Sequence, residues 1–323
     1  MSAAGSTTVP RRSIGRSGPS AGVLSLGSWH TYDRMDFRDA VGMLREAVDA
    51  GVNLFDVGVY GQPDRPPRVF TDVIFSAMVR AAGLRREDYL LSAKLWLEEY
   101  PTRSLRDQIE NALLRAGVEH ADLVVLGDIR HEVDLGQLVL DLAELDHAGL
   151  IRSWGVNNWS ATNVQTLIDS AASAGVAGPS IAQLKYSVAR RSIPDGEPFA
   201  RIFAQGVSLE SSDVFEGGVL LGKGGGARQV GRDPGGIRER IEGSVAGVRA
   251  VADELGATPA QLCLAFTLTH PANATTLFGA TGIEQLRENL AAVDLVERVG
   301  GERLRELVTP FWADRGVVDP EGP

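Results

Sequence analysis

The stretch FRDAVGMLREAVDAGVNLFD, residues 37–56, contains a helix pattern followed directly by a strand pattern. In its first part, residues 37–50, apolar residues recur at the spacing i, i+3, i+4 and i+7, which predicts an amphipathic helix. These residues are Ala40, Met43, Leu44 and Ala47. The last part, NLFD (53–56), is a short apolar run typical of a buried strand. A helix that leads into a buried strand favours an α/β fold with parallel strands.

The same unit recurs along the chain. Strands are predicted at 22–27, 53–56, 89–94, 122–126, 152–156, 180–184, 206–210 and 275–279. Helices are predicted at 37–50, 103–116, 135–148, 161–173, 197–205, 258–269 and 283–295. Eight units of about 40 residues each predict one closed (β/α)8 TIM barrel over residues 10–316, between flexible tails at 1–9 and 317–323. No GxGxxG motif follows the first strand, which disfavours a two-domain dinucleotide fold.

The composition argues against several classes of protein. The 323 residues carry 32 Lys and Arg against 42 Asp and Glu, a formal net charge of −10 without a basic block, so no nucleic-acid partner is expected. No apolar run approaches the ~20 residues of a membrane span, and the start lacks the apolar core of a secretory signal. We therefore expect a cytoplasmic protein without membrane contact, which the single cysteine, Cys263, also fits. No pair among the five histidines has metal-ligand spacing, so no metal is expected.

Three chemistry-bearing residues follow two neighbouring predicted strands. Asp56 ends the second strand, Lys94 ends the third, and Tyr60 follows Asp56 by four positions. Because the catalytic residues of such barrels lie at the C-terminal ends of the strands, we expect the three side chains to meet there. A lysine beside a carboxylate can bring the pKa of a phenol into the range needed to protonate a carbonyl oxygen. Each residue also has an ordinary explanation, as a cap, a packed loop residue or half of an ion pair.

Eight segments follow one another from Arg12 to about Val293. They are RSIGRSG…LSLGSW (12–29), GVNLFDVGVYG (51–61), LSAKLW (91–96), LRAGVEHADLVVL (114–126), GLIRSWGVNNWS (149–160), IAQLKYS (181–187), GGVLLGK (217–223) and TPAQLCLAF…LFGATGIEQLREN (258–289). Together they resemble the aldo-keto reductase family, in particular the branch that includes the potassium-channel β-subunits. The resemblance implies the barrel fold, with Asp56, Tyr60 and Lys94 as the catalytic residues.

The resemblance also implies that NADPH or NADP+ lies extended across the mouth of the barrel. The cofactor-binding residues that it implies are Gly27, Ser28, Trp29, Asn157, Asn158, Gln183, Gly222, Lys223, Thr281, Gln285, Glu288 and Asn289. Asn157, Asn158 and Gln183 would hold the carboxamide, Lys223 the pyrophosphate, and the last four the adenosine end. The segment 279–289 independently reads as a turn into a helix start, where exposed N–H groups favour a phosphate.

The chain departs from the family pattern at the position of the catalytic histidine. Gly127 stands there, followed by Asp128, and neither supplies an imidazole donor. Removal of the ring predicts a void of roughly imidazole size beside Tyr60. A bulkier substrate, a water molecule or the side chain of Asp128 could fill it.

Further departures concern the nicotinamide end. The family has five steps from its Asp to its Tyr, against four here, a difference that Gly58 and Gly61 could absorb. Ser212 stands where an aromatic residue should stack on the nicotinamide, and Phe215 is the nearby ring. Asn157 replaces a serine.

Candidate substrate-binding residues follow the first, third, fourth and fifth strands. They are His30, Trp96, Gly127, Asp128 and Trp159. Trp29, Trp96 and Trp159 would share one face of the barrel and form a flat apolar wall, or else simply close the barrel top. His131 is either a solvated loop residue or a substitute imidazole donor.

These observations predict an NADP(H)-dependent oxidoreductase of aldo-keto reductase type, which reduces a carbonyl or an activated double bond. The expected partner is a fairly large, polar small molecule that could be cyclic, and a homo-oligomer is left open. Two alternatives remain. The fold could carry non-redox lyase, dehydratase or isomerase chemistry, or the protein could be a regulator that retains a cofactor pocket.

Overall fold

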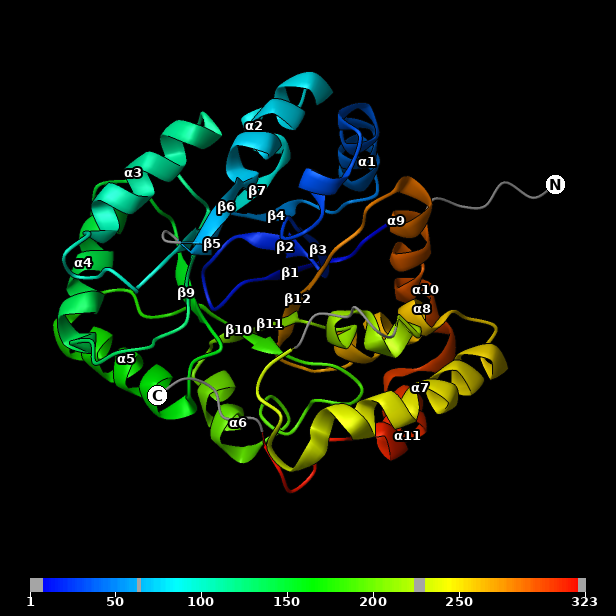
Figure 1. Ribbon diagram of the computed structural model, residues 1–323. Helices are drawn as coiled ribbons and strands as arrows, with labels where there is room; N and C mark the ends of the chain where they lie inside the picture. Colours follow the sequence, from blue (N-terminus) through cyan, green and yellow to red (C-terminus); the bar gives the residue numbers. More distant parts are fainter. Residues whose placement is uncertain (1–7, 63–64, 224–229, 319–323) are drawn as a thin grey trace.

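Eight short strands close into a parallel barrel in the computed structural model of the protein, which describes residues 8–62, 65–223 and 230–318 (Figure 1). In order around the barrel they are β3 (Leu24–Gly27), β4 (Leu54–Val57), β7 (Leu90–Leu95), β8 (Leu123–Leu126), β9 (Trp154–Asn157), β10 (Ile181–Lys185), β11 (Ser208–Ser212) and β12 (Asn273–Phe278). Strand β12 pairs with β3 and closes the sheet. Every strand overlaps one of the predicted strands, so the prediction of a (β/α)8 TIM barrel is confirmed.

Helices surround the barrel and bury their apolar faces against it (Figure 1). The helices at predicted positions are α1 (Phe37–Asp49), α3 (Leu105–Ala116), α4 (Leu135–His147), α5 (Ala161–Ala174), α6 (Glu197–Ala204), α8 (Pro259–Leu268), α9 (Ile283–Leu290) and α10 (Ala292–Val299). The prediction at 283–295 is thus resolved into two helices. Further helices are α2 (Thr71–Ala82), α7 (Ile237–Glu254) and α11 (Gly301–Val308). The sequence signal of α7 is weak, because few of its side chains are buried.

An antiparallel hairpin of β1 (Arg11–Ser13) and β2 (Ser20–Gly22) covers the N-terminal ends of the barrel strands. Ile14 and Ala21 of the hairpin join a small apolar cluster with Leu54, Leu123 and Ile181, which begin or nearly begin their strands. The barrel is therefore filled and closed at this end. Any site must lie at the opposite end, where the strands finish.

The segment after β4 also forms a hairpin, of β5 (Val59–Gln62) and β6 (Arg65–Phe70), which the sequence did not predict. It stands at the C-terminal end of the barrel and carries Tyr60. Thr71 fixes its base, because the Thr71 hydroxyl accepts from the N–H of Gly58 at 3.0 Å and donates to the Gly58 carbonyl at 2.9 Å.

The chain is anchored slightly earlier than the predicted start of the barrel at residue 10. Val9 is buried, and its N–H donates to the carbonyl oxygen of Ala50 at 2.8 Å. Residues 1–7 and 319–323 of the predicted tails lie outside the described residues. Within the described ranges, no helix combines the length and the hydrophobicity needed to cross a membrane.

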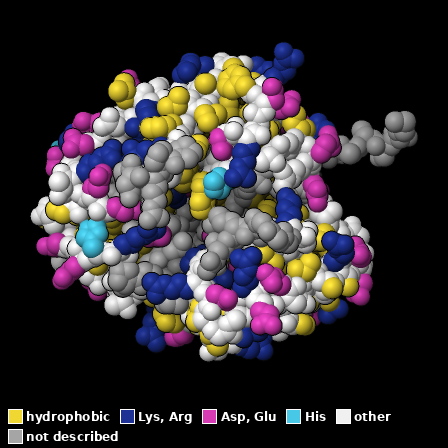
Figure 2. Space-filling view, viewed as in Figure 1, with side chains coloured by type: hydrophobic (Ala, Val, Ile, Leu, Met, Phe, Trp, Pro, Cys, Tyr) yellow, Lys and Arg dark blue, Asp and Glu magenta, His cyan; other side chains and the backbone are white. Residues whose placement is uncertain are grey.

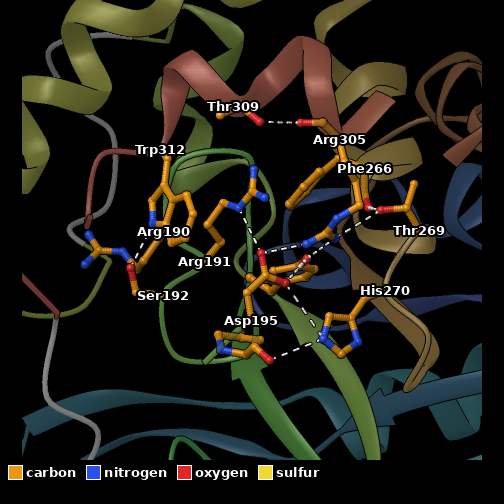
Figure 3. A network of polar contacts seen from close by, with 12 residues as sticks. Arg190, Arg191, Ser192, Asp195, Phe266, Thr269, His270, Arg305, Thr309 and Trp312 are labelled. Carbon is orange, nitrogen blue, oxygen red and sulfur yellow. Dashed lines mark hydrogen bonds and ion pairs between the residues drawn. The ribbon is translucent and has the colours of Figure 1, made fainter. Parts of the chain in front are cut away.

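A buried polar network fastens the C-terminal helix α11 to the loop that follows β10 (Figure 3). Asp195 in this loop accepts from Arg191 at 2.9 Å and from Arg305 of α11 at 2.7 Å. The guanidinium of Arg191 lies between the rings of Phe266 and Trp312, 4.9 Å and 4.7 Å from their centroids. These contacts hold the segment that directly follows the mouth-facing end of β10.

Candidate active site

Asp56, Tyr60 and Lys94 lie in direct contact at the C-terminal end of the barrel. Asp56 accepts from the Tyr60 hydroxyl at 2.9 Å with Oδ1, and from the Lys94 ammonium at 3.0 Å with Oδ2. All three line a cavity of about 1600 Å³ at the mouth. The structure therefore brings the three side chains together at the strand ends, and their catalytic role stays a prediction.

Gly58 allows the hairpin to bring Tyr60 back over the barrel. A Cβ on Gly58 would lie 3.0 Å from the Cβ of Lys94, so a larger residue would push β5 away from β7. Gly61 has a φ of +96°, a conformation that glycine adopts readily. The two glycines therefore accommodate the four-residue interval between Asp56 and Tyr60.

The environment of Tyr60 keeps its hydroxyl protonated. Burial, followed by the charge of Asp56 and the hydrogen bond to it, raises the pKa of the Tyr60 phenol well above its usual value. Within the described part of the chain, Lys94 makes no hydrogen bond to Tyr60, and the two side chains bind different oxygens of Asp56. The expectation that Lys94 and Asp56 bring the phenol pKa into the range for proton transfer is therefore not met in this structure, because burial and the charge of Asp56 hold the proton on Tyr60.

The predicted void beside Gly127 is occupied by the side chain of Trp96. A Cβ on Gly127 would lie 2.5 Å from Cε3 of the Trp96 indole, so the prediction of an empty, imidazole-sized space is wrong. The ring is fixed because its Nε1 donates to the carbonyl oxygen of Val59 at 3.1 Å. Trp96 packs edge-on against Tyr60, with 6.2 Å between ring centroids. An indole therefore flanks the phenol on this side.

Asp128 does not turn in toward Tyr60. Its Oδ1 accepts from Nδ2 of Asn157 at 2.9 Å, and its Oδ2 lies 3.4 Å from Arg130. Asp128 and Asn157 therefore hold each other at the rim of the cavity.

Trp159 is not part of the cavity wall, contrary to the prediction. It has no exposed surface, and its Nε1 donates to the carbonyl oxygen of Gly127 at 2.9 Å. Trp29, in contrast, is 44% exposed and stacks on Tyr60 with 5.8 Å between centroids. The indoles that line the cavity are those of Trp29 and Trp96.

The two histidines near the mouth differ in position. His30 lines the cavity and stacks on Trp29, 4.9 Å between centroids. His131 is exposed, and its Nε2 is bonded to the carbonyl oxygen of Tyr100 at 3.1 Å. His131 therefore does not substitute for an imidazole at Gly127. The described residues contain no cluster of three or more His, Cys, Asp or Glu side chains able to hold a metal.

Most of the predicted cofactor residues line the same cavity. They are Gly27, Ser28, Trp29, Asn157, Asn158, Gln183, Lys223, Thr281 and Gln285. Gly222, Glu288 and Asn289 are not among the lining residues: Glu288 is exposed on α9, and Asn289 is buried. At the nicotinamide end, Ser212 and Phe215 line the cavity. On the face drawn in Figure 2, acidic and basic side chains of the described residues are interspersed.

The adenosine end contains polar groups that lack protein partners. Asn289 is 1% exposed, and neither its Nδ2 nor its Oδ1 has a hydrogen-bond partner among the described residues. An amide presents a donor and an acceptor side by side, which matches the edge of a nucleobase. Gly282 is the N-cap of α9 and has no side chain to cap it, so the first N–H groups of the helix can bind an anion. An unpartnered amide and an uncapped helix start are compatible with the dinucleotide that the resemblance implies, although Asn289 does not itself line the cavity.

At the predicted nicotinamide end, the polar side chains are already hydrogen-bonded to other residues of the protein. Gln183 accepts from Lys94 at 2.8 Å with Oε1 and donates to Glu210 at 2.9 Å with Nε2. Oδ1 of Asn158 accepts from the N–H of Lys185 at 3.3 Å. The assignment of Asn157, Asn158 and Gln183 to the carboxamide stays a prediction.

Glu210 was not singled out from the sequence. It ends the predicted strand GVSLE (206–210), and the signal that could have identified it is a carboxylate inside an otherwise apolar buried strand. In the structure it has no exposed surface and belongs to the interior of the barrel. With Glu210, the polar side chains near the site come from β11 as well as from β4 and β7.

Comparison with known proteins finds similarity along most of the chain. The sequence profile described as Aldo/keto reductase family matches residues 23–298. The chain is 25% identical to a putative voltage-gated potassium channel subunit beta of Schizosaccharomyces pombe, over 93% of this chain and 92% of the relative. It is 25% identical to a probable voltage-gated potassium channel subunit beta of Arabidopsis thaliana and 26% identical to one of Oryza sativa subsp. japonica, with 94% of each chain covered in both cases.

Proposed function

The chain belongs to the aldo/keto reductase family, and we propose that it is an NADP(H)-dependent oxidoreductase that reduces a carbonyl group or an activated double bond of a small molecule. The observation that carries the proposal is the hydrogen-bonded series Tyr60–Asp56–Lys94 at the base of the cavity. It supplies a neutral proton donor, the Tyr60 hydroxyl, which is hydrogen-bonded to the carboxylate of the buried ion pair Asp56–Lys94. The unpartnered amide of Asn289, which is buried on the same helix as the cavity residue Gln285, supports a nucleotide near this helix.

The bound NADPH would supply the hydride, and the residues of the chain would supply the proton and the orientation. The Tyr60 ring stacks on Trp29 and packs edge-on against Trp96, so these two indoles would flank a substrate that reaches the phenol. When the Tyr60 proton passes to the substrate, a phenolate forms next to the Asp56 carboxylate. The Lys94 ammonium, 3.0 Å from Asp56, offsets that added negative charge.

The substrate in this proposal is a fairly large and polar molecule. Support comes from the cavity of about 1600 Å³ and from the charged residues that line it, which include Glu98, Glu99 and Arg103. The cytoplasmic location is part of the proposal, supported by the one cysteine, Cys263, which is a buried thiol of α8.

The test is a fluorescence titration with NADPH and with NADH, followed by oxidation of the bound NADPH with a panel of ketones, quinones and enones. We expect NADPH to bind more tightly than NADH, and Lys223→Ala to weaken binding by about 1–2 kcal/mol. Arg201→Ala on α6 is the matched control, because this exposed cation pairs with Glu197 and does not line the cavity. Absence of binding by either nucleotide would refute the proposal.

A regulatory protein that holds the cofactor without turnover is the second candidate. The observation that favours it is the names of the three relatives, which are all potassium channel subunits beta. Tight NADPH binding without oxidation by any member of the panel would favour this candidate.

A further inference from the structure

Glu210 is a fully buried glutamate in the interior of the barrel. In the sheet it pairs with Gln183 of β10 on one side and with Thr275 of β12 on the other. Its Oε2 accepts from Nε2 of Gln183 at 2.9 Å, whereas its Oε1 has no hydrogen-bond partner among the described residues. The hydroxyl of Thr275 is likewise without a partner there.

This geometry favours a protonated carboxyl group. An ionised oxygen that is buried without a donor is costly, whereas a carboxylic acid carries an O–H at that position and can donate it to a neighbouring hydroxyl. Burial, followed by the negative charge of Asp56, raises the pKa of Glu210 to about 7, and the charge of Lys94 opposes this shift. The adjacent strands β10 and β12 present the uncharged side chains of Gln183 and Thr275 to it. Asp56 and Lys94 are therefore the charged groups that Glu210 faces.

Glu210 also contributes to which way round the Gln183 amide lies. The amide nitrogen donates to Glu210 at 2.9 Å and lies 3.4 Å from Oδ2 of Asp56, so Glu210 is the nearer acceptor. The amide oxygen therefore faces Lys94 and accepts from the ammonium at 2.8 Å. With the amide reversed, an NH2 group would face the ammonium and the donor–acceptor match would be lost at both ends. Glu210 therefore helps to position Lys94, because it orients the Gln183 amide whose oxygen accepts from the Lys94 ammonium.

We propose that Glu210 is a positioning residue for the reaction at Tyr60: it holds the Gln183 amide against Lys94, and Tyr60 releases its proton more readily while Glu210 is itself protonated. The physical reason is charge. With Glu210 protonated, the buried set of Asp56, Lys94 and Glu210 is neutral. Once Glu210 ionises, two carboxylates face one ammonium, and a phenolate at Tyr60 becomes less stable. This inference rests on the proposed function for the reaction, but the protonation of Glu210 can be tested without it.

The test compares wild type with Glu210→Gln, which keeps an acceptor for Gln183 but cannot ionise, and with Glu210→Leu, which removes the acceptor. The matched control is Glu216→Gln. Burial also raises the pKa of Glu216 to about 7, but its carboxylate is bonded to Ser187 and Arg190 and not to Gln183. Circular dichroism first establishes that each variant folds.

The first readout is infrared difference spectroscopy of the apoprotein between about pH 5 and pH 9. We expect the carbonyl band of a protonated carboxylic acid to disappear as the pH rises through about 7 in the wild type. The Glu210→Gln variant should lack that part of the signal, and Glu216→Gln should retain it. A difference spectrum that is the same in wild type and Glu210→Gln would overturn the proposal.

The second readout is the single-turnover rate of oxidation of bound NADPH by 4-nitrobenzaldehyde, with the enzyme in excess. In wild type and Glu216→Gln the rate should fall about tenfold as the pH rises through about 7, and in Glu210→Gln it should stay level. The Glu210→Leu rate should be low at every pH. A fall of the same size in Glu210→Gln would overturn the proposal. Failure of NADPH to bind would instead refute the proposed function and leave the infrared result to decide the state of Glu210.

Discussion

Trp96 occupies the space that a side chain at residue 127 would need: a Cβ on Gly127 would lie 2.5 Å from Cε3 of the indole. The two residues lie at the ends of the adjacent strands β7 and β8. The indole of Trp96 can therefore lie in this place only because residue 127 is a glycine. As a result, an indole and not an imidazole lies beside Tyr60.

The first prediction concerns this pair. Gly127→Ala should lower the free energy of unfolding by about 1–3 kcal/mol, because the anchored indole must shift to admit the methyl group. Trp96→Phe in the same chain should recover part of the loss, measured by urea denaturation of the four proteins of the cycle. Gly243→Ala on α7 is the control, since a Cβ there meets no atom within 4 Å, and it should be neutral or stabilising. An unchanged stability of Gly127→Ala would contradict the tight contact.

The second prediction concerns the proton donor. Tyr60→Phe should lower the rate of NADPH oxidation by on the order of 10²–10⁴ and leave the affinity for NADPH nearly unchanged. Lys94→Met should behave alike, because Lys94 compensates the charge at Asp56 and does not hold the nucleotide. Steady-state kinetics and fluorescence titration measure the two effects separately. If Tyr60→Phe retained near-full activity, another group would be the acid.

The third prediction concerns the unpartnered amide. Asn289→Leu replaces a buried amide by an apolar group of similar shape, so the free protein should be as stable as wild type or more stable. NADPH should nevertheless bind about tenfold more weakly, because a donor and an acceptor for the base are lost. Thermal unfolding and fluorescence titration give the two values. A loss of stability with unchanged affinity would show that Asn289 is only structural.

The fourth prediction concerns the choice of substrate. Simple aldehydes such as 4-nitrobenzaldehyde should be poor substrates at steady state, since neither Trp96 nor Asp128 places a fixed imidazole-like donor beside Tyr60. Loss of one such donor costs about 2.7–4 kcal/mol in the barrier. Larger polar carbonyl compounds should give higher kcat/KM values. A panel in which small aldehydes were the best substrates would refute this expectation.

The fifth prediction concerns the network of Figure 3. Although burial opposes the shift, the hydrogen bond and charge of Arg305 lower the pKa of Asp195. A lowered carboxylate pKa stabilises the fold above the ordinary Asp range, and this contribution is lost as the pH falls through the folded-state pKa. Asp195→Asn should therefore be less stable than wild type at neutral pH, and the difference should shrink in acid. Urea denaturation at several pH values measures this difference, and a gap that widened in acid would contradict the assignment.

The sequence by itself determined the barrel and the meeting of Asp56 with Lys94. Short apolar runs alternating with helical periods require parallel pairing, and parallel strands end at one edge, so residues at neighbouring strand ends must be close. These are local signals, set by the spacing of apolar residues within about ten positions. The hairpin β5–β6 has no such spacing of apolar residues, and α7 has few buried apolar residues, so neither element was predicted.

Only the tertiary structure decided where the side chains of the site point. Trp159 and Trp96 both follow strands, yet one is buried under Gly127 and the other lies beside Tyr60. Gln183 and Glu210 meet because β10 and β11 are in register, and Glu210 comes near Asp56, 154 positions earlier, only through closure of the barrel. The direction of a side chain and the charge around it depend on neighbours from distant strands, and those neighbours are fixed only when the whole sheet closes.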